Sequence, residues 1–461
     1  MLVEQLYLDC LSQASYLVAD ETTGRALVVD PRRDVQVYLD AAAERGVRIE
    51  GVINTHVHAD FASGHLELAA ATGAWIGYGR AARTEFTTRA LAHGDRISLG
   101  DVVVEVLETP GHTPESISLL VFAHATDTVP DAVLTGDALF IGDVGRPDLL
   151  ASAGHAARDL AGMLYESVHH VLMALPDEVR VLPGHGAGSA CGKNLSTQLS
   201  STIGEQRATN YACRPMPREE FVALVTAGQP PAPAYFGHDA LLNQRHHALL
   251  DTVVPALTVE EFLKVAGEAV VLDVRDGTDF AAAHIEGSLN VGLDGRFSET
   301  VGAVLRPDVP VVLVAPEGRE TEAVVRLARV GFDHVAGHLA RPEAAFLEMV
   351  DRITPASRIT AAHLRELSTG SVTVLDVRGA AEREGGLIPG SLHIPLQQLL
   401  ARIDDVPTDR PTVVHCAGGY RSSTAASLLR AHGHTDVSDL IGGYAAYAPA
   451  TACAATARSA T

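Results

Sequence analysis

The second half of this chain contains one sequence pattern twice. The segment V-V-L-D-V-R at residues 270–275 recurs as T-V-L-D-V-R 103 residues later, and I-E-G-S-L-N-V at residues 285–291 recurs as I-P-G-S-L-H-I at the same offset. In each copy a helical stretch comes first and strands then alternate with helices, which is typical of a parallel α/β sheet. Because a unit of about 100 residues can form its own core, we predict two consecutive α/β domains, at residues 256–350 and 356–455.

The first half of the chain has a different organisation. Short apolar runs alternate with glycine-containing turns as far as L-P-G-H-G at residues 182–186, and each run has the length of a strand that ends in a polar loop. Residues 35–46 and 64–73 have helical spacing and end in a glycine, a common helix terminator. We predict a third α/β domain at residues 1–240. A proline-containing stretch near its end favours an extended conformation, and a linker at residues 241–255 then leads to the repeated domains.

Charge and cysteine content narrow the class of protein. The formal charge is −22, from 35 basic and 57 acidic side chains, which repels phosphate backbones and anionic lipid. We therefore expect neither nucleic acid nor a membrane as a partner. No basic signal segment opens the chain, and no apolar run reaches about 18 residues. The cysteines are scattered and lack C-x-x-C spacing, which is typical of reduced thiols in a cytoplasmic protein: Cys10, Cys191, Cys213, Cys416 and Cys453.

Potential metal ligands gather in the first domain, where each follows an apolar run. The segment N-T-H-V-H-A-D-F at residues 54–61 and the later motifs T-P-G-H-T, L-T-G-D-A and L-P-G-H-G supply six of them: His56, His58, Asp60, His112, Asp137 and His185. Strand ends in one sheet layer can converge, so these nitrogen and oxygen donors are expected to face one cavity. That donor set suits zinc, iron or manganese better than a soft metal.

These motifs resemble the metallo-β-lactamase fold, in its glyoxalase II branch, over roughly residues 1–240. The resemblance implies an αββα fold. In the dinuclear hydrolases of this fold, the residue after the aspartate is a histidine that binds a second metal, whereas this chain has Phe61. A phenyl ring offers no lone pair, so a tightly bound second metal is not expected.

The stretch D-A-L-F-I-G-D-V-G-R-P-D-L at residues 137–149 is similar to the persulfide dioxygenases of this fold, which use mononuclear non-haem iron. The resemblance implies one Fe(II) per chain, with zinc as the alternative metal, held by His56, His112 and Asp137. Two histidines and one carboxylate leave other coordination positions open for O₂ and a substrate sulfur. Three further residues are then expected to orient the ligands or a water by hydrogen bonds: His58, Asp60 and His185.

Three residues close to these motifs are candidates for contact with the substrate. Arg146 follows Gly145 in the same loop as Asp137 and is a candidate partner for a carboxylate on the substrate's carrier thiol. Cys191 and Lys193 lie in G-S-A-C-G-K, just after the loop of His185. Cys191 is a candidate for accepting or relaying sulfur, although a small buried thiol is the commoner fate of a lone cysteine.

A second reactive site is expected in the last domain. The segment T-V-V-H-C-A-G-G-Y-R-S-S places Cys416 directly after an apolar strand, with Arg421 close behind. Such a loop aims backbone N–H groups at one point before a helix begins and so stabilises a thiolate, to which Arg421 adds positive charge. We predict that Cys416 is a nucleophile whose loop consists of Ala417, Gly418, Gly419 and Tyr420.

Together with L-D-V-R at residues 375–378 and with Glu382, this loop is similar to that of the single-domain rhodaneses, sulfurtransferases in which the cysteine carries a persulfide. A phosphatase-type C-x₅-R loop would need an arginine where this chain has Ser422. In the first copy of the repeat, Ala315 stands in place of the nucleophile. Residues 256–350 thus resemble a rhodanese that has lost catalysis.

The two sites together predict one enzyme for sulfide clearance. It would oxidise a low-molecular-weight thiol persulfide with O₂ to sulfite and thiol, and transfer sulfur from Cys416 to sulfite, giving thiosulfate. We expect a homo-oligomer. Two alternatives stay open: a thioester hydrolase of the glyoxalase II kind with two zinc ions, and a sulfur carrier whose metal domain is not catalytic.

Overall fold

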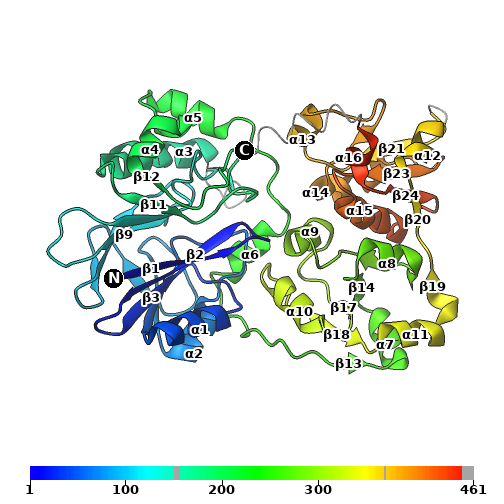
Figure 1. The fold of residues 1–461 in the computed structure, drawn as a ribbon, viewed down its shortest axis with the longest axis horizontal. Coiled ribbons are helices and arrows are strands. Elements are labelled where there is room, and N and C mark those ends of the chain that lie inside the picture. Colours follow the sequence, from blue (N-terminus) through cyan, green and yellow to red (C-terminus); the bar gives the residue numbers. More distant parts are fainter. Residues whose placement is uncertain (150–155, 368–369, 449–461) are drawn as a thin grey trace. The chain divides into compact units, whose positions relative to one another are not determined.

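The computed structural model describes residues 1–149, 156–367 and 370–448, which divide into two compact units (Figure 1). Unit 1 comprises Met1–Leu250 with Ala328–Gly331, and unit 2 comprises Asp251–Leu327 with the chain after Gly331. The domain boundaries expected from the sequence stay predictions. The expected end of the last domain at residue 455, together with Cys453, lies outside the described residues.

Unit 1 contains two six-stranded sheets. In the first sheet β1 to β3 are antiparallel and β3 to β6 are parallel: β1 (Leu2–Leu8), β2 (Gln13–Asp20), β3 (Arg25–Val29), β4 (Arg48–Ile53), β5 (Trp75–Gly79) and β6 (Arg89–Leu91). The second sheet is antiparallel except for the parallel pair β10–β11, and its order is β12 (Ser201–Thr202), β11 (Arg180–Pro183), β10 (Ala132–Gly136), β9 (Ile117–Phe122), β8 (Val103–Glu108) and β7 (Arg96–Ser98).

The described part of unit 1 has these α-helices beside the sheets: α1 (Gln36–Arg45), α2 (His65–Thr72), α3 (Ala157–Glu166), α4 (Ile203–Thr209), α5 (Arg218–Thr226) and α6 (Phe236–Leu242). The two helices predicted by spacing are α1 and α2. Each ends at a glycine in the left-handed conformation, Gly46 with φ 65° and Gly73 with φ 75°, which a side chain would strain. The predicted helix terminators are therefore confirmed.

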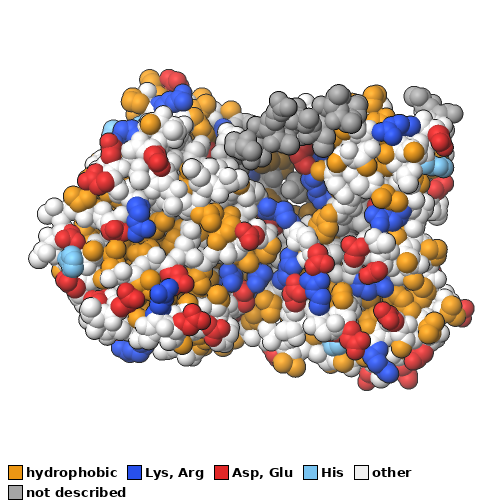
Figure 2. Space-filling view, in the orientation of Figure 1, with side chains coloured by type: hydrophobic (Ala, Val, Ile, Leu, Met, Phe, Trp, Pro, Cys, Tyr) orange, Lys and Arg blue, Asp and Glu red, His pale blue; other side chains and the backbone are white. Residues whose placement is uncertain are grey.

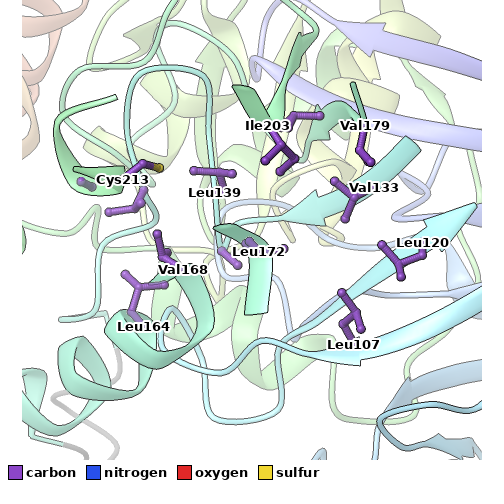
Figure 3. Packing of buried hydrophobic residues seen from close by; sticks show 14 of the residues in the cluster. Leu107, Leu120, Val133, Leu139, Leu164, Val168, Leu172, Val179, Ile203 and Cys213 are labelled. Atoms are coloured by element: carbon purple, nitrogen blue, oxygen red, sulfur yellow. The ribbon is translucent and has the colours of Figure 1, made fainter. Parts of the chain in front are cut away.

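Apolar clusters show that unit 1 has four layers. One cluster lies between the two sheets and includes Val18 and Val104, and another packs the first sheet against α1 and α2 through Val28 and Tyr38. A third, drawn in Figure 3, packs the second sheet against α3 and α5. Burying one such aliphatic side chain contributes about 2 kcal/mol. The order helix, sheet, sheet, helix confirms the expected αββα fold.

Unit 2 contains two five-stranded parallel sheets with the same strand order, which confirms the sequence repeat. The first runs β13 (Ala256–Leu257), β18 (Val335–Leu339), β17 (Val311–Val314), β14 (Val270–Asp273) and β16 (Leu289–Asn290). The second runs β20 (Ser357–Ile359), β24 (Val437–Leu440), β23 (Thr412–His415), β21 (Thr373–Asp376) and β22 (Leu392–His393). A short antiparallel pair, β15 (His284–Ile285) with β19 (Ile353–Thr354), completes the strands described here.

Helices follow the strands in both halves of unit 2. The first half has α7 (Val259–Ala266), α8 (Gly277–Ala282), α9 (Phe297–Val304), α10 (Glu320–Ala328) and α11 (Pro342–Glu348). The second half has α12 (Ala361–Glu366), α13 (Ala380–Glu384), α14 (Leu396–Leu399), α15 (Tyr420–Ala431) and α16 (Gly443–Tyr447). Thr258 and Glu261 form a capping box at the start of α7, which satisfies backbone N–H groups that a helix start leaves free.

Two surface properties bear on the expected partners. On the face of the molecule drawn in Figure 2, acidic, basic and apolar side chains are interspersed. Within the described ranges, no helix combines the length and the apolar character needed to cross a bilayer.

Candidate functional site

The structure brings the three expected iron ligands together at one end of unit 1. His56 follows β4 of the first sheet, while His112 and Asp137 follow β8 and β10 of the second. Asp137 Oδ2 lies 3.9 Å from His56 Nε2 and 3.5 Å from His112 Nε2. One ligand atom from each residue lies within 4.8 Å of the other two, and all three residues are buried. The strand ends of the two sheets therefore converge as the motif pattern predicts.

Hydrogen bonds orient both imidazoles toward Asp137. His112 Nδ1 lies 2.9 Å from the carbonyl oxygen of Arg146; a carbonyl only accepts, so Nδ1 carries the proton and Nε2 has the lone pair. His56 Nδ1 lies 3.0 Å from the Thr55 hydroxyl, which donates to Asp30 Oδ2 over 2.9 Å. This arrangement again directs an Nε2 lone pair toward Asp137, and such orienting contacts are typical of metal-binding histidines.

The buried polar atoms at this point fit a bound metal ion. His56 Nε2 and Asp137 Oδ2 are buried, and neither has a hydrogen-bond partner within the described part of the chain. A buried polar atom without a partner costs about 1–3 kcal/mol, so two that face each other fit a shared metal cation. Burial and the neighbouring His58 and His112 hold the pKa of His56 well below its usual value, which keeps the imidazole in the neutral form that binds metals.

Asp60, His185 and Cys191 form a second cluster beside the first, again with ligand atoms within 4.8 Å of one another. His185 donates from Nδ1 to Asp137 Oδ1 over 2.8 Å, and its Nε2 lies 2.7 Å from Asp60 Oδ2. Burial opposes a charge on His185, but the Asp137 and Asp60 carboxylates outweigh it and hold the pKa of His185 well above its usual value. Burial raises the pKa of the Cys191 thiol.

Phe61 fills the space beside the two clusters. Its ring is fully buried, with its centroid 4.3 Å from that of His58 and 6.5 Å from that of His185. His58 donates from Nε2 to Asp30 Oδ1 over 2.9 Å, and its buried Nδ1 has no hydrogen-bond partner among the described residues. A hydrocarbon ring thus occupies a place where a histidine would offer another nitrogen donor.

The structure places the two basic candidates for substrate contact in protein contacts. The Arg146 guanidinium is buried and donates to both carboxylate oxygens of Asp148, over 2.7 Å and 2.6 Å. Lys193 Nζ donates to the carbonyl oxygens of Leu224, 2.8 Å away, and Ala227, 3.1 Å away. Their proposed role toward substrate stays a prediction. Arg146 contributes to the metal centre through its backbone carbonyl, which holds His112.

Asp30 is the residue near the metal centre that the sequence reasoning missed. It accepts hydrogen bonds from the Thr55 backbone N–H over 2.7 Å and from the Thr55 hydroxyl, and it also binds His58. The signal was present, because Asp30 follows the apolar run of β3 just as the other acidic residues follow theirs. Its φ of 53° is a further sign of a special position, since non-glycine residues rarely adopt such angles.

In unit 2 the loop of Cys416 closes around the sulfur. The Gly419 N–H donates to Cys416 Sγ over 3.1 Å, and Gly419 has a φ of 108° that favours glycine. The Arg421 guanidinium binds Glu382 of α13 through two hydrogen bonds. Ala417 and Gly418 are exposed, while Cys416 itself is buried.

The other half of unit 2 lacks this nucleophile at the equivalent point. Its strand β17 ends at Val314, one residue before Ala315, as β23 ends at His415, one residue before Cys416. Ala315 has only a methyl side chain, so it cannot form a persulfide. Cys10, Cys191, Cys213 and Cys416 are free thiols.

Comparison with known proteins agrees with this architecture. The model of the metallo-beta-lactamase superfamily matches residues 8–185, and that of the rhodanese-like domain matches residues 258–340 and 360–450. Hydroxyacylglutathione hydrolase of Rhodospirillum rubrum is 35% identical over 230 residues, which cover 50% of this chain and 80% of that protein. Four other curated relatives are matched over between 54% and 63% of their length.

Two solved structures are similar as well. A metallo-beta-lactamase from Staphylococcus aureus has 34% sequence identity and a TM-score of 0.66, and the match covers 74% of this chain and 98% of that one. ETHE1 from Myxococcus xanthus has 31% identity and a TM-score of 0.46, covering 53% and 98%. These families indicate a metal-binding enzyme. The chain belongs to the metallo-beta-lactamase superfamily and carries two rhodanese-like domains after its metallo-beta-lactamase domain.

Proposed function

We propose that this protein oxidises a small thiol persulfide with O₂ at the His56–His112–Asp137 centre and transfers sulfur at Cys416. The observation that carries the proposal is the convergence of two histidines and one carboxylate, in which the buried atoms His56 Nε2 and Asp137 Oδ2 have no hydrogen-bond partner among the described residues. Phe61, beside that centre, argues for one metal rather than two. A donor set of two imidazoles and one carboxylate is typical of non-haem Fe(II) oxygenases.

The residues of the centre have separate tasks. Fe(II), when bound, supplies the redox chemistry with O₂; the overall reaction is R–S–SH + O₂ + H₂O to R–SH + H₂SO₃, in which sulfur loses four electrons to one O₂. His185 fixes Oδ1 of Asp137 by a hydrogen bond and so leaves Oδ2 directed at the two imidazoles. Phe61 excludes water from one side of the centre.

Cys416 performs the second reaction. Its thiolate attacks the outer sulfur of a persulfide, the S–S bond of the donor breaks, and the thiol leaves with a proton. Sulfite then attacks the outer sulfur on Cys416, the new S–S bond forms, and thiosulfate leaves as the thiolate is restored. The Gly419 N–H and the Arg421 guanidinium stabilise the thiolate in this cycle.

Thioester hydrolysis with two metal ions is the second candidate. The cluster of Asp60, His185 and Cys191 offers further donors beside the first set, and the Rhodospirillum rubrum relative is a hydroxyacylglutathione hydrolase. In this alternative, a metal-bound hydroxide would attack the thioester carbonyl. A cytoplasmic location and a homo-oligomeric state stay predictions; the cysteines in the described part of the chain are free thiols, which supports a reducing compartment.

The test combines metal analysis with two assays on anaerobically purified full-length protein. We expect about one iron per chain, and oxygen uptake with release of sulfite on addition of glutathione persulfide. The Cys416→Ser variant keeps the oxygen uptake and loses thiosulfate formation. Two zinc ions per chain, hydrolysis of a glutathione thioester and no oxygen uptake would establish the second candidate instead. Loss of all turnover in Cys416→Ser would favour a sulfur carrier.

A further inference from the structure

Tyr420 lies in the loop of Cys416, yet its side chain contacts the other half of unit 2. Its hydroxyl donates to the carbonyl oxygen of Gly292 over 2.6 Å. Its ring lies so close to Gly295 that a Cβ at that position would overlap three ring carbons. We propose that the half without a nucleophile positions the Cys416 loop by holding Tyr420. This inference rests on the sulfurtransferase role of Cys416 proposed above.

Tyr420 stands between the two residues that serve the sulfur. Gly419, just before it, donates its N–H to Cys416 Sγ, and Arg421, just after it, carries the guanidinium bound by Glu382. Because adjacent residues share backbone geometry, holding the Tyr420 ring restrains both the N–H and the guanidinium. Stabilising groups act only when their positions are held to within about 0.5 Å.

The two ends of the loop are held by different halves. At the start of the loop, the N–H groups of Tyr444 and Ala445, which belong to the same half as Cys416, donate to the carbonyl oxygens of Cys416 and Ala417 over 2.7 Å and 3.0 Å. At the end of the loop, the half without a nucleophile binds Tyr420. Removing the second contact is therefore expected to release the loop on the side that carries Gly419.

Asn290 extends the same contact along α15. Its side-chain oxygen accepts from the Ser423 hydroxyl over 2.8 Å, and its backbone N–H donates to Ser427 Oγ over 2.9 Å. Its side-chain nitrogen donates to the backbone carbonyl oxygen of Asp273, 3.1 Å away. The helix that begins at Tyr420 is thus held on the same half, through polar groups that are buried.

The glycine whose carbonyl accepts the hydrogen bond from Tyr420 is not repeated in the other half. At the repeat offset of 103 residues, Gly292 corresponds to Pro395. Any side chain at position 295 would occupy the space of the ring. The half that lost its nucleophile at Ala315 therefore has a surface fitted to the loop of the other half.

The test uses Gly295→Ala, Tyr420→Ala and the double variant. In Gly295→Ala the new methyl displaces the ring, and we expect kcat for sulfur transfer from thiosulfate to cyanide to fall about tenfold, with KM changed less than about twofold. Alkylation of Cys416 by iodoacetamide at pH 7, followed on its peptide by mass spectrometry, slows in parallel. Because the methyl meets no ring in the Tyr420→Ala background, the double variant equals Tyr420→Ala alone.

Two conservative variants keep the test decisive if a larger change unfolds unit 2. Tyr420→Phe keeps the ring and loses the hydrogen bond to Gly292, so we expect transfer to fall about threefold, while the matched control Tyr447→Phe in α16 matches wild type. Additive losses in the double variant, or normal alkylation and transfer in folded Gly295→Ala, would overturn the proposal. If Gly295→Ala slows the alkylation of Cys416 although the wild type itself transfers no sulfur, the proposed function is rejected and the positioning role is retained.

Discussion

The guanidinium of Arg421 donates two hydrogen bonds to the carboxylate of Glu382, from Nη1 to Oε2 over 2.7 Å and from Nη2 to Oε1 over 2.6 Å. The pair joins the first turn of α15 to α13 and fixes the plane of the guanidinium beside the thiol. Burial opposes the charge on Glu382, but Arg421 outweighs it and holds the pKa of that carboxyl below its usual value.

This pair gives a first prediction for Glu382→Gln. An amide accepts through one oxygen only, so the bidentate contact is lost and Arg421 is no longer oriented toward the sulfur. We expect kcat for sulfur transfer to fall about tenfold. Glu384→Gln, an equally exposed position in the same helix, is the control and keeps wild-type rates. Equal rates in both variants would mean that Arg421 is oriented by other contacts.

A second prediction concerns the ring beside the metal centre. Phe61→His places nitrogen donors near Asp60 and His185, where the structure has a hydrocarbon. We expect the zinc content of protein loaded with excess zinc to rise from about one toward about two ions per chain by elemental analysis. Phe61→Leu, which adds no donor, stays at about one. An unchanged stoichiometry in Phe61→His would show that Phe61 does not limit the second site.

The third prediction follows from a close approach of backbone to the metal centre. A Cβ on Gly145 would overlap the carbonyl oxygen of Asp137 and lie 2.9 Å from His112 Nδ1. Gly145→Ala therefore pushes two expected ligands out of position, and we expect metal affinity to fall about 10- to 100-fold in a competition titration with a chelator. Gly237→Ala in α6, whose Cβ meets nothing within 4 Å, binds metal as the wild type does.

The fourth prediction is an acid-dependent loss of stability in unit 2. His284 is buried against Phe280, with ring centroids 3.9 Å apart, and burial lowers its pKa from 6.5 to about 4. Below pH 6.5 the His284 imidazole takes up a proton in the unfolded chain but stays neutral in the folded chain. The stability that His284 contributes is therefore complete above that pH. That stability is lost progressively as the pH falls to about 4, by roughly 3 kcal/mol in total.

Urea unfolding of unit 2 at pH 4 to 7 measures this loss. We expect the free energy of unfolding of wild type to fall more steeply over this range than that of His284→Gln, whose side chain does not titrate. Parallel pH dependence in the two proteins would place the acid sensitivity in other groups.

Much of the architecture was predictable because it is encoded locally. The alternation of apolar runs with glycine turns, the terminators Gly46 and Gly73, and the capping box of Thr258 depend on neighbouring residues alone. The repeat at residues 270–275 and 373–378 predicted two like sheets, and the strand orders agree. The ligand-type residues were found because each lies in a segment that follows a strand, where side chains first become available for chemistry.

The sequence by itself therefore determined the fold class and the duplicated domains, and it predicted the donor set around Asp137 and the reactive loop of Cys416. The tertiary structure decided which of these residues are held, and by what. Asp30 reaches Thr55 and His58, and the hydroxyl of Tyr420 meets the carbonyl of Gly292, 128 residues away in the chain. Such contacts depend on distances between segments that only the packed core brings together, so no local pattern encodes them.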